Sequence, residues 1–314
     1  MVSSDENTTG RKDHLSQGAS VSVYDSLIAG SISGAVARGI TAPLDTLKIR
    51  LQLQVHKNVH SGALSTLTSI CRNEGIKALW KGNTPAEILY VLYGASQFTT
   101  YTVLNEALVN LQKNDPWRAS IITPVHSLLV GIGTGSISTF ITYPFDFLRT
   151  RLAANSSNEF LSMTKTCLKT IREEGFFGLY AGVKPSLISI TASTGLMFWT
   201  YENARSFSKE KNIPFIEGIC GLLAGAVSKG VTFPLDTIRK RLQMYSETKV
   251  KHDTSNKMGQ LCKIMIRNEG FLSFYKGFGI SILKSSPTSA ISLFMYEYAL
   301  DMIVKAENKF SIES

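Results

Sequence analysis

One motif, containing a proline, an aspartate and two basic residues, occurs three times in the 314 residues. Its copies begin at Pro43, Pro144 and Pro234 and read P-x-D-x-x-[KR]-x-[KR], with starts 101 and 90 residues apart. A Gly-x-x-x-Gly pair begins 13 residues before each proline, and Glu-Gly followed by an aromatic residue and a further Gly comes after each copy. Three features in one register indicate three related units of about 100 residues, which bury their apolar surfaces against one another.

The stretches between charged residues are long enough to suggest membrane helices. Segments 88–105, 119–145 and 185–201 contain no Asp, Glu, Lys or Arg, and a membrane-spanning helix needs about 20 mostly apolar residues. The mean hydropathy is only +0.05, because polar residues concentrate in the loops and at a few repeated helix positions. We therefore expect an all-α membrane protein with six transmembrane helices, at 25–53, 84–108, 123–152, 184–207, 215–243 and 279–304.

These helices divide the chain into three helix-loop-helix repeats and two tails. The expected boundaries are a disordered N-terminal tail 1–23, repeats at 24–118, 119–212 and 213–305, and a C-terminal tail 306–314. Residues 1–24 have no apolar core and resemble neither a secretory signal nor a transit peptide. An even number of spans places both termini on the same side of the membrane.

Charge and composition exclude several functions. The net charge of +9 suits anionic lipid and an anionic solute. The sequence contains no basic run interleaved with aromatic residues, so we expect no nucleic-acid partner. The four cysteines lack C-x-x-C spacing and the histidines lack ligand spacing, so we expect free thiols, no metal and no cofactor. No nucleophile with a base stands out, so we expect no enzyme.

The repeated charges predict a gate. A single copy would be explained by a kinked helix whose Asp and Lys pair three residues apart. Three copies at equivalent depth bring acids and bases together inside a bundle, where buried charges are tolerated in lipid. The expected pairs, each worth about 0.2–1 kcal/mol, are Asp45–Arg149, Asp146–Arg239 and Asp236–Lys48. Gln52 and Gln243 lie one turn further on and could brace such pairs, whereas the third equivalent position is Ala153.

Two further repeated features keep two interpretations each. The Gly-x-x-x-Gly pairs allow close helix approach, either for motion or for tight static packing. The aromatic-(Lys)-Gly stretches, such as Trp80-Lys81-Gly82, suit either lipid phosphates at a helix N-terminus or a simple turn with an interfacial aromatic anchor.

The threefold motif together with E-G-x-x-x-[aromatic]-[KR]-G resembles the mitochondrial carrier family from about residue 24 to 303. The resemblance implies threefold pseudosymmetry around a central cavity, short matrix-side helices, bound cardiolipin and alternating access in the inner mitochondrial membrane. It also implies termini on the intermembrane-space side. A threefold cavity inside one chain makes function as a monomer the simpler expectation. A second, cytoplasmic gate of the family would comprise Tyr201, Glu202, Arg205, Tyr296 and Glu297, and it is incomplete because Leu300 follows Tyr296-Glu297 and helix 84–108 reads Tyr101-Thr102.

Positions that break the threefold pattern predict the solute site. Five residues before the prolines stand Arg38, Thr139 and Lys229, and seven after the even-helix glycines stand Leu89, Ser189 and Lys284. Arg38, Lys229 and Lys284 are thus three unpaired cations, each costing about 2.5–3.5 kcal/mol in a spanning helix, which predicts a highly negative solute. Glu87 either contacts the solute or pairs and caps locally near a helix start.

The resemblance narrows the solute further. The family's acid carriers have Arg where this chain has Ser189-Ile190, so a nucleotide or cofactor is favoured. Stretches such as "LYVLYGASQFTTY" and "TYPFDFLRTRLAAN" are similar to the branch of the family that carries thiamine pyrophosphate in fungi. Exchange of that solute is expected, with its diphosphate on the three cations and its thiazolium near Glu87 and Tyr90 or Tyr93. The alternatives are a carrier of an adenine nucleotide or coenzyme A, and a non-transporting membrane scaffold.

Overall fold

Six long helices dominate the computed structural model, which describes residues 23–54, 62–114, 123–157, 159–209, 216–245 and 257–313. Each long helix has at least 27 residues, about 40 Å at 1.5 Å per residue, which exceeds the hydrocarbon thickness of a bilayer. They are α1 (Val23–Leu53), α3 (Asn83–Asn114), α4 (Thr123–Ala154), α6 (Val183–Lys209), α7 (Ile216–Tyr245) and α9 (Phe278–Glu313). The expected tail 1–23 lies outside the described residues except for Val23, where α1 begins.

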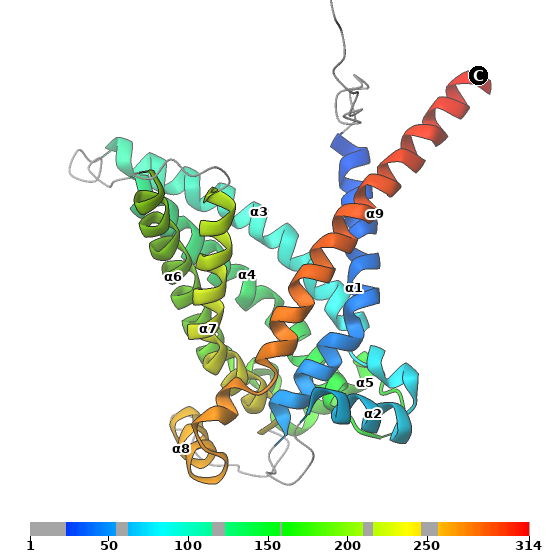
Figure 1. Cartoon of the computed structure of the whole chain (residues 1–314), viewed down its shortest axis with the longest axis vertical. Coiled ribbons are helices and arrows are strands. Elements are labelled where there is room, and N and C mark those ends of the chain that lie inside the picture. The colour runs from blue at the N-terminus through cyan, green and yellow to red at the C-terminus, as the bar shows by residue number, and fades with distance from the viewer. Residues whose placement is uncertain are drawn as a thin grey trace, which may run out of the picture. The chain divides into compact units, whose positions relative to one another are not determined.

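A short helix and a 3₁₀ turn separate the two long helices of every repeat (Figure 1). These elements are α2 (Ala63–Asn73) with η1 (Ile76–Trp80), α5 (Met163–Glu174) with η3 (Phe176–Tyr180), and α8 (Lys257–Glu269) with η4 (Phe271–Tyr275). The helix-loop-helix repeats are therefore confirmed. Helices α3 and α9 run further than expected, to Asn114 and Glu313, because hydrogen bonding continues into polar sequence beyond the apolar stretch.

The chain divides into two units by its internal contacts. One combines the described residues of 1–36 with 290–313, and the other spans 37–289. Within residues 37–289, α3 packs on α4 and α6 packs on α7, while α4 also contacts α6 and α7. Every contact of the site described below lies inside this second unit.

Each repeat has a small apolar core around its 3₁₀ turn, to which its short helix, its first long helix or both contribute buried side chains. Two hydroxyls tie these parts together: Thr46 Oγ1 donates to the Leu79 carbonyl at 2.8 Å, and Thr237 Oγ1 donates to the Phe274 carbonyl at 2.7 Å. Burial of these apolar side chains fixes the short helix against the motif that follows the proline. The three cores comprise Ile70, Ala78 and Leu79; Phe147, Leu148 and Leu179; and Ile238, Leu242, Leu261, Met265 and Phe274.

The first long helix of each repeat continues through its proline. Proline has no N–H, so the carbonyl four residues earlier loses its helical partner. At Pro43 that carbonyl belongs to Gly39, and it accepts a hydrogen bond of 2.8 Å from the indole Nε1 of Trp80. The aromatic residue of the second motif thus repairs the defect that the first motif creates.

A glycine with positive φ precedes the second long helix of each repeat. Gly82, Gly182 and Gly277 have φ of 82°, 84° and 83°. A Cβ on Gly82 would lie 2.7 Å from the Arg149 carbonyl oxygen, so only glycine lets this turn approach α4 so closely.

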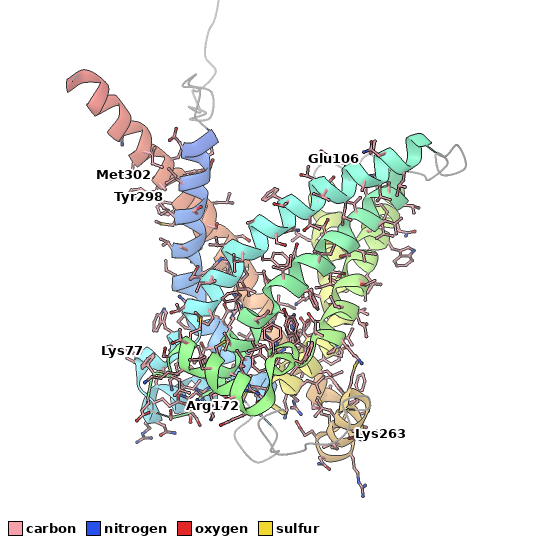
Figure 2. The ribbon with its side chains drawn as sticks, turned by 180° about the vertical axis from the view of Figure 1, so that it is seen from behind. Lys77, Glu106, Arg172, Lys263, Tyr298 and Met302 are labelled. Atoms are coloured by element: carbon pink, nitrogen blue, oxygen red, sulfur yellow. The ribbon has the colours of Figure 1, made fainter. Side chains whose placement is uncertain are left out.

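By composition, one helix in the described residues, Val125–Ala154, is long and apolar enough to cross a membrane. Several of the other long helices carry more charge, and α1 alone contains Arg38, Asp45, Lys48 and Arg50. Exposed cations lie on the short segments of all three repeats. Lys77, Arg172 and Lys263 lie at one end of the unit formed by residues 37–289 (Figure 2).

Candidate functional site: a charged cavity

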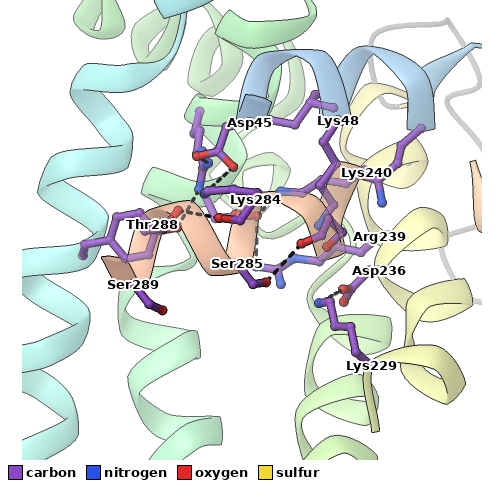
Figure 3. Close-up of a pocket in the computed structure, with 16 residues that line it drawn as sticks. Asp45, Lys48, Lys229, Asp236, Arg239, Lys240, Lys284, Ser285, Thr288 and Ser289 are labelled. Carbon is purple, nitrogen blue, oxygen red and sulfur yellow. Dashed lines mark hydrogen bonds and ion pairs between the residues drawn. The ribbon is translucent and has the colours of Figure 1, made fainter. Parts of the chain in front are cut away.

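A cavity of about 480 Å³ lies among α1, α3, α4, α7 and α9 within residues 37–289 (Figure 3). Four hydroxyl residues of α9 line it from one helix face: Ser281, Ser285, Thr288 and Ser289. Its charged lining residues comprise six cations and three carboxylates, an excess of three positive charges. They are Lys48, Arg149, Lys229, Arg239, Lys240 and Lys284, and Asp45, Asp146 and Asp236.

Two of the three predicted gate pairs are present in the gate ring, a name used here for the six residues Asp45, Lys48, Asp146, Arg149, Asp236 and Arg239. Asp45 Oδ2 lies 2.7 Å from Arg149 Nη2 and joins α1 to α4. Asp146 Oδ2 lies 2.9 Å from Arg239 Nη2 and joins α4 to α7.

The third predicted pair, Asp236–Lys48, is not formed among the described residues, which corrects the expectation of a closed ring. Asp236 Oδ2 instead accepts from Lys229 Nζ at 2.7 Å, because Lys229 lies two turns earlier on the same helix. Lys48 Nζ lies 5.4 Å from the centre of the Phe233 ring, a cation–π distance.

The two glutamines play unequal parts. Gln243 Nε2 donates to Asp146 Oδ2 at 2.7 Å and so braces the second pair, as its position suggested. Gln52 Nε2 donates instead to Thr237 Oγ1 at 3.4 Å. Both side chains are fully buried.

The cations predicted to be unpaired have partners in the structure. Lys229 binds Asp236, and Lys284 Nζ lies 2.5 Å from Asp45 Oδ1. The prediction considered only Glu87 as a partner, whereas the gate aspartates themselves are within reach. The guanidinium carbon of Arg38 lies 3.0 Å from the centre of the Tyr90 ring, and Arg38 is not among the residues lining the cavity.

The other predicted solute contacts surround this cavity in different ways. Tyr90 lines it, and its hydroxyl accepts from Arg149 Nη1 at 3.2 Å. Ser189 Oγ donates to Asp236 Oδ1 at 3.2 Å, behind the lining. Ile190 packs toward α4, where its Cγ2 would lie 3.0 Å from a Cβ on Gly135. Glu87 has a buried Oε1 with no hydrogen-bond partner among the described residues.

Sequence reasoning missed Lys240, although it contacts the centre of the gate ring. Its Nζ lies 2.9 and 3.0 Å from the two carboxylate oxygens of Asp146 and 2.8 Å from Thr150 Oγ1. The signal was available, because the equivalent motif positions in the first two repeats hold Ile49 and Thr150, so a cation there breaks the threefold pattern.

The last basic residue of each motif binds outside the gate ring. Arg50 pairs with Glu74 at 2.7 Å and donates to the Ala153 carbonyl at 2.6 Å. Arg151 pairs with Glu174 at 2.5 Å and reaches the Gln243 carbonyl, and Arg241 pairs with Glu269 and reaches the Gln52 carbonyl. Each arginine therefore joins the short helix of its own repeat to the backbone of the next repeat.

Two of these glutamates are shared with a lysine. Lys81 Nζ and Lys276 Nζ each lie 2.6 Å from Glu74 and Glu269, respectively. Burial alone would raise the pKa of both carboxyl groups, but hydrogen bonds from the arginine and the lysine outweigh it and lower the pKa below its usual range.

The predicted cytoplasmic gate lies partly outside the described side chains. Tyr201, Glu202 and Arg205 lie on α6, and their side chains are outside the described part of the chain. Tyr296 and Glu297 lie on α9 in the other unit, where Tyr296 is half-buried and Glu297 is exposed. This gate stays a prediction.

Comparison with known proteins gives one family over nearly the whole chain. The mitochondrial carrier protein family matches residues 19–112, 121–212 and 210–307. "Mitochondrial thiamine pyrophosphate carrier 1" of Lodderomyces elongisporus is 56% identical over 301 residues, covering 92% of this chain and 94% of the relative. The proteins of the same name from Scheffersomyces stipitis and Candida albicans are 55% and 52% identical, covering 95% of this chain and 97% and 98% of their own lengths.

Proposed function

Because the chain belongs to the mitochondrial carrier family, we propose that it transports thiamine pyrophosphate across the mitochondrial inner membrane. Relatives that are 52–56% identical to it over almost their whole length carry that solute in their names. We propose exchange by alternating access, performed by a monomer with both termini in the intermembrane space and with no catalytic step.

The charge of the cavity is the observation that carries this proposal. Its lining holds three more cations than carboxylates, and a net excess of charge inside a membrane protein is costly unless a ligand uses it. A diphosphate ester supplies several negative charges in one compact group, and lysine amines bind phosphate oxygens as point charges. Lys229 and Lys284 are the proposed diphosphate ligands.

The proposed matrix gate consists of the gate ring with Gln243 and Gln52. Lys229 and Lys284 bind gate aspartates in the structure. A bound diphosphate competes for these lysines, which weakens the hold on Asp45 and Asp236 and allows the ring to open. The cytoplasmic gate is proposed to comprise Tyr201, Glu202, Arg205, Tyr296 and Glu297, and cardiolipin to bind the aromatic-(Lys)-Gly turns.

The cationic end of the solute is proposed to lie near Glu87 and Tyr90. The planar guanidinium of Arg38 already stacks on the Tyr90 ring, and a thiazolium could take the same place once Arg38 moves away from the ring. The free Oε1 of Glu87 could accept from the aminopyrimidine. Ser189 and Ile190 then act from behind, on Asp236 and on the α4–α6 contact.

The test is uptake of labelled thiamine pyrophosphate by the purified protein in liposomes loaded with thiamine phosphates, nucleotides or coenzyme A. We expect uptake that internal thiamine phosphates stimulate. Lys284→Glu should abolish it, because the substitution places a carboxylate beside Asp45. Lys263→Glu, a change at an exposed lysine of α8 outside the cavity, should leave it unchanged.

Two outcomes would replace this proposal. Uptake driven only by adenine nucleotides or coenzyme A would make the chain a carrier of those solutes. No uptake of any phosphorylated anion, with the protein folded in the liposomes, would favour a non-transporting scaffold.

A further inference from the structure

We propose that Lys240 is a third phosphate-binding lysine, which with Lys229 and Lys284 makes the cavity selective for a diphosphate over a monophosphate. This inference rests on the proposed function, since it assigns a specificity-determining residue to the same site. It gives the third cationic position to Lys240, on α7, instead of to Arg38, on α1.

The first support is the pairing of the gate aspartates. Each of them binds one lysine that does not belong to the gate ring. Asp45 binds Lys284 and Asp236 binds Lys229 (Figure 3), and Asp146 binds Lys240. We call Lys229, Lys240 and Lys284 the extra lysines. All three line the same cavity, whereas Arg38 does not.

The second support is the charge balance. The gate ring alone contains three carboxylates and three cations and is neutral, so the whole positive excess of the cavity comes from the extra lysines. They also occupy three unrelated positions of the repeat: five residues before a proline, six after a proline, and within the second long helix. Threefold closure therefore does not account for them, and binding of an asymmetric anion does.

The third support is that Lys240 can leave Asp146 at low cost. When Lys240 turns to a phosphate, Asp146 keeps its ion pair with Arg239 at 2.9 Å and its hydrogen bond from Gln243 at 2.7 Å. A buried carboxylate that loses every partner is strongly destabilised, but this one would keep two. The alternative role, a brace that only holds Asp146, duplicates what Arg239 and Gln243 already do.

The experiment uses the full-length purified protein and inorganic pyrophosphate and orthophosphate as probes. The concentration of each anion that gives half of its maximal rise in melting temperature is measured for Lys240→Thr, which introduces the residue of the second repeat. We expect this half-effect concentration to rise about tenfold for pyrophosphate and at most about twofold for orthophosphate, because the second phosphate group needs the third cation. Lys240→Arg, which keeps the charge, should recover most of the pyrophosphate response.

Thr150→Val is the matched control, because it removes the hydroxyl that holds Lys240 Nζ at 2.8 Å but keeps the charge. It should leave the ratio of the two half-effects unchanged. The proposal would be overturned if Lys240→Thr weakened the response to both anions equally, or if Thr150→Val weakened the pyrophosphate response as selectively as Lys240→Thr does. Lys240 would then be only a brace for Asp146. Failure to take up thiamine pyrophosphate while Lys240→Thr still shows the selective loss would overturn the proposed solute alone.

Discussion

At the scale of single residues, Glu74 and Glu269 hold the short helices to the rest of their repeats. Each carboxylate accepts hydrogen bonds from the last arginine of the motif and from a lysine in the turn that follows the short helix. Both glutamates lie where a short helix ends and are well buried as side chains, with 6% and 3% of their surface exposed. Hydrogen bonds to charged groups are worth about 1.5–3 kcal/mol each, so these two sites contribute more than surface pairs do.

These glutamates give the protein an acid-sensitive stability. Their pKa is lowered on folding, so their contribution is fully present above the unfolded value of about 4.3 and is lost as the pH falls through the lower folded value. Glu74→Gln with Glu269→Gln should lower the melting temperature at neutral pH and flatten its decline below about pH 4. Thermal unfolding across pH measures this. The exposed Glu173→Gln should change neither, and an equal decline in all three proteins would contradict the assignment.

Residue positions also show where sequence reasoning reaches its limit. The pairs Asp45–Arg149 and Asp146–Arg239 could be predicted, because equivalent motif positions on successive helices face one another. The spacing of seven residues is enough to predict the Lys229–Asp236 bond. The sequence interpretation instead places Asp236 in the gate and Lys229 in a separate solute site. A long lysine side chain crosses two helical turns, so one residue belongs to both groups.

At the scale of elements, the turn before each second long helix sets how closely the repeats approach. The backbone of Gly82 lies against the Arg149 carbonyl, that of Gly182 against the Arg239 carbonyl, and that of Gly277 against the Lys48 carbonyl. These carbonyls belong to the cations of the gate ring. Each turn thus supports the helix segment that carries the gate of the next repeat.

Gly82→Ala should therefore destabilise the protein more than Gly75→Ala. Both glycines have a φ near +83°, and an alanine there costs about 1–2 kcal/mol. A Cβ at Gly75 would meet nothing within 4 Å, whereas at Gly82 it would meet backbone at 2.7 Å, which adds about 1–3 kcal/mol of overpacking. Melting temperatures of the two variants compare the positions, and equal losses would show that backbone strain alone determines the effect.

The elements themselves were largely predictable. Segments without charge indicated α3, α4 and α6. The threefold repeat indicated the other three long helices and the grouping of all six. Their ends were less predictable, because a helix continues as long as its backbone bonds do, and α9 accordingly runs to Glu313. The 3₁₀ turns were not predicted, since their form depends on the glycines before and after them.

At the scale of the whole molecule, ion pairs close two of the three junctions of the gate ring. An aspartate–arginine pair joins α1 to α4 and another joins α4 to α7, while within the described residues no such pair joins α7 to α1. The sequence repeats the same motif three times, yet the extra lysines make the three junctions chemically different.

Double-mutant cycles should reveal this inequality. Asp45→Asn with Arg149→Gln should show a coupling of about 0.5–3 kcal/mol, as contacting residues do. Asp236→Asn with Lys48→Gln should show less than about 0.5 kcal/mol without solute, because the two side chains are not bonded. The free energy of unfolding of each single and double variant supplies the cycle. Equal couplings at the two junctions would mean that the ring is closed throughout.

The contacts of Arg50, Arg151 and Arg241 with backbone carbonyls have an evolutionary consequence. Each arginine joins neighbouring repeats by recognising main-chain oxygens, which every amino acid supplies, and the acceptors lie at Ala153, Gln243 and Gln52 alike. Substitutions on the receiving helix therefore leave the junction intact. A threefold ancestor built in this way could diversify the inward-facing side chains of each repeat separately, and so acquire new cargo without rebuilding its scaffold.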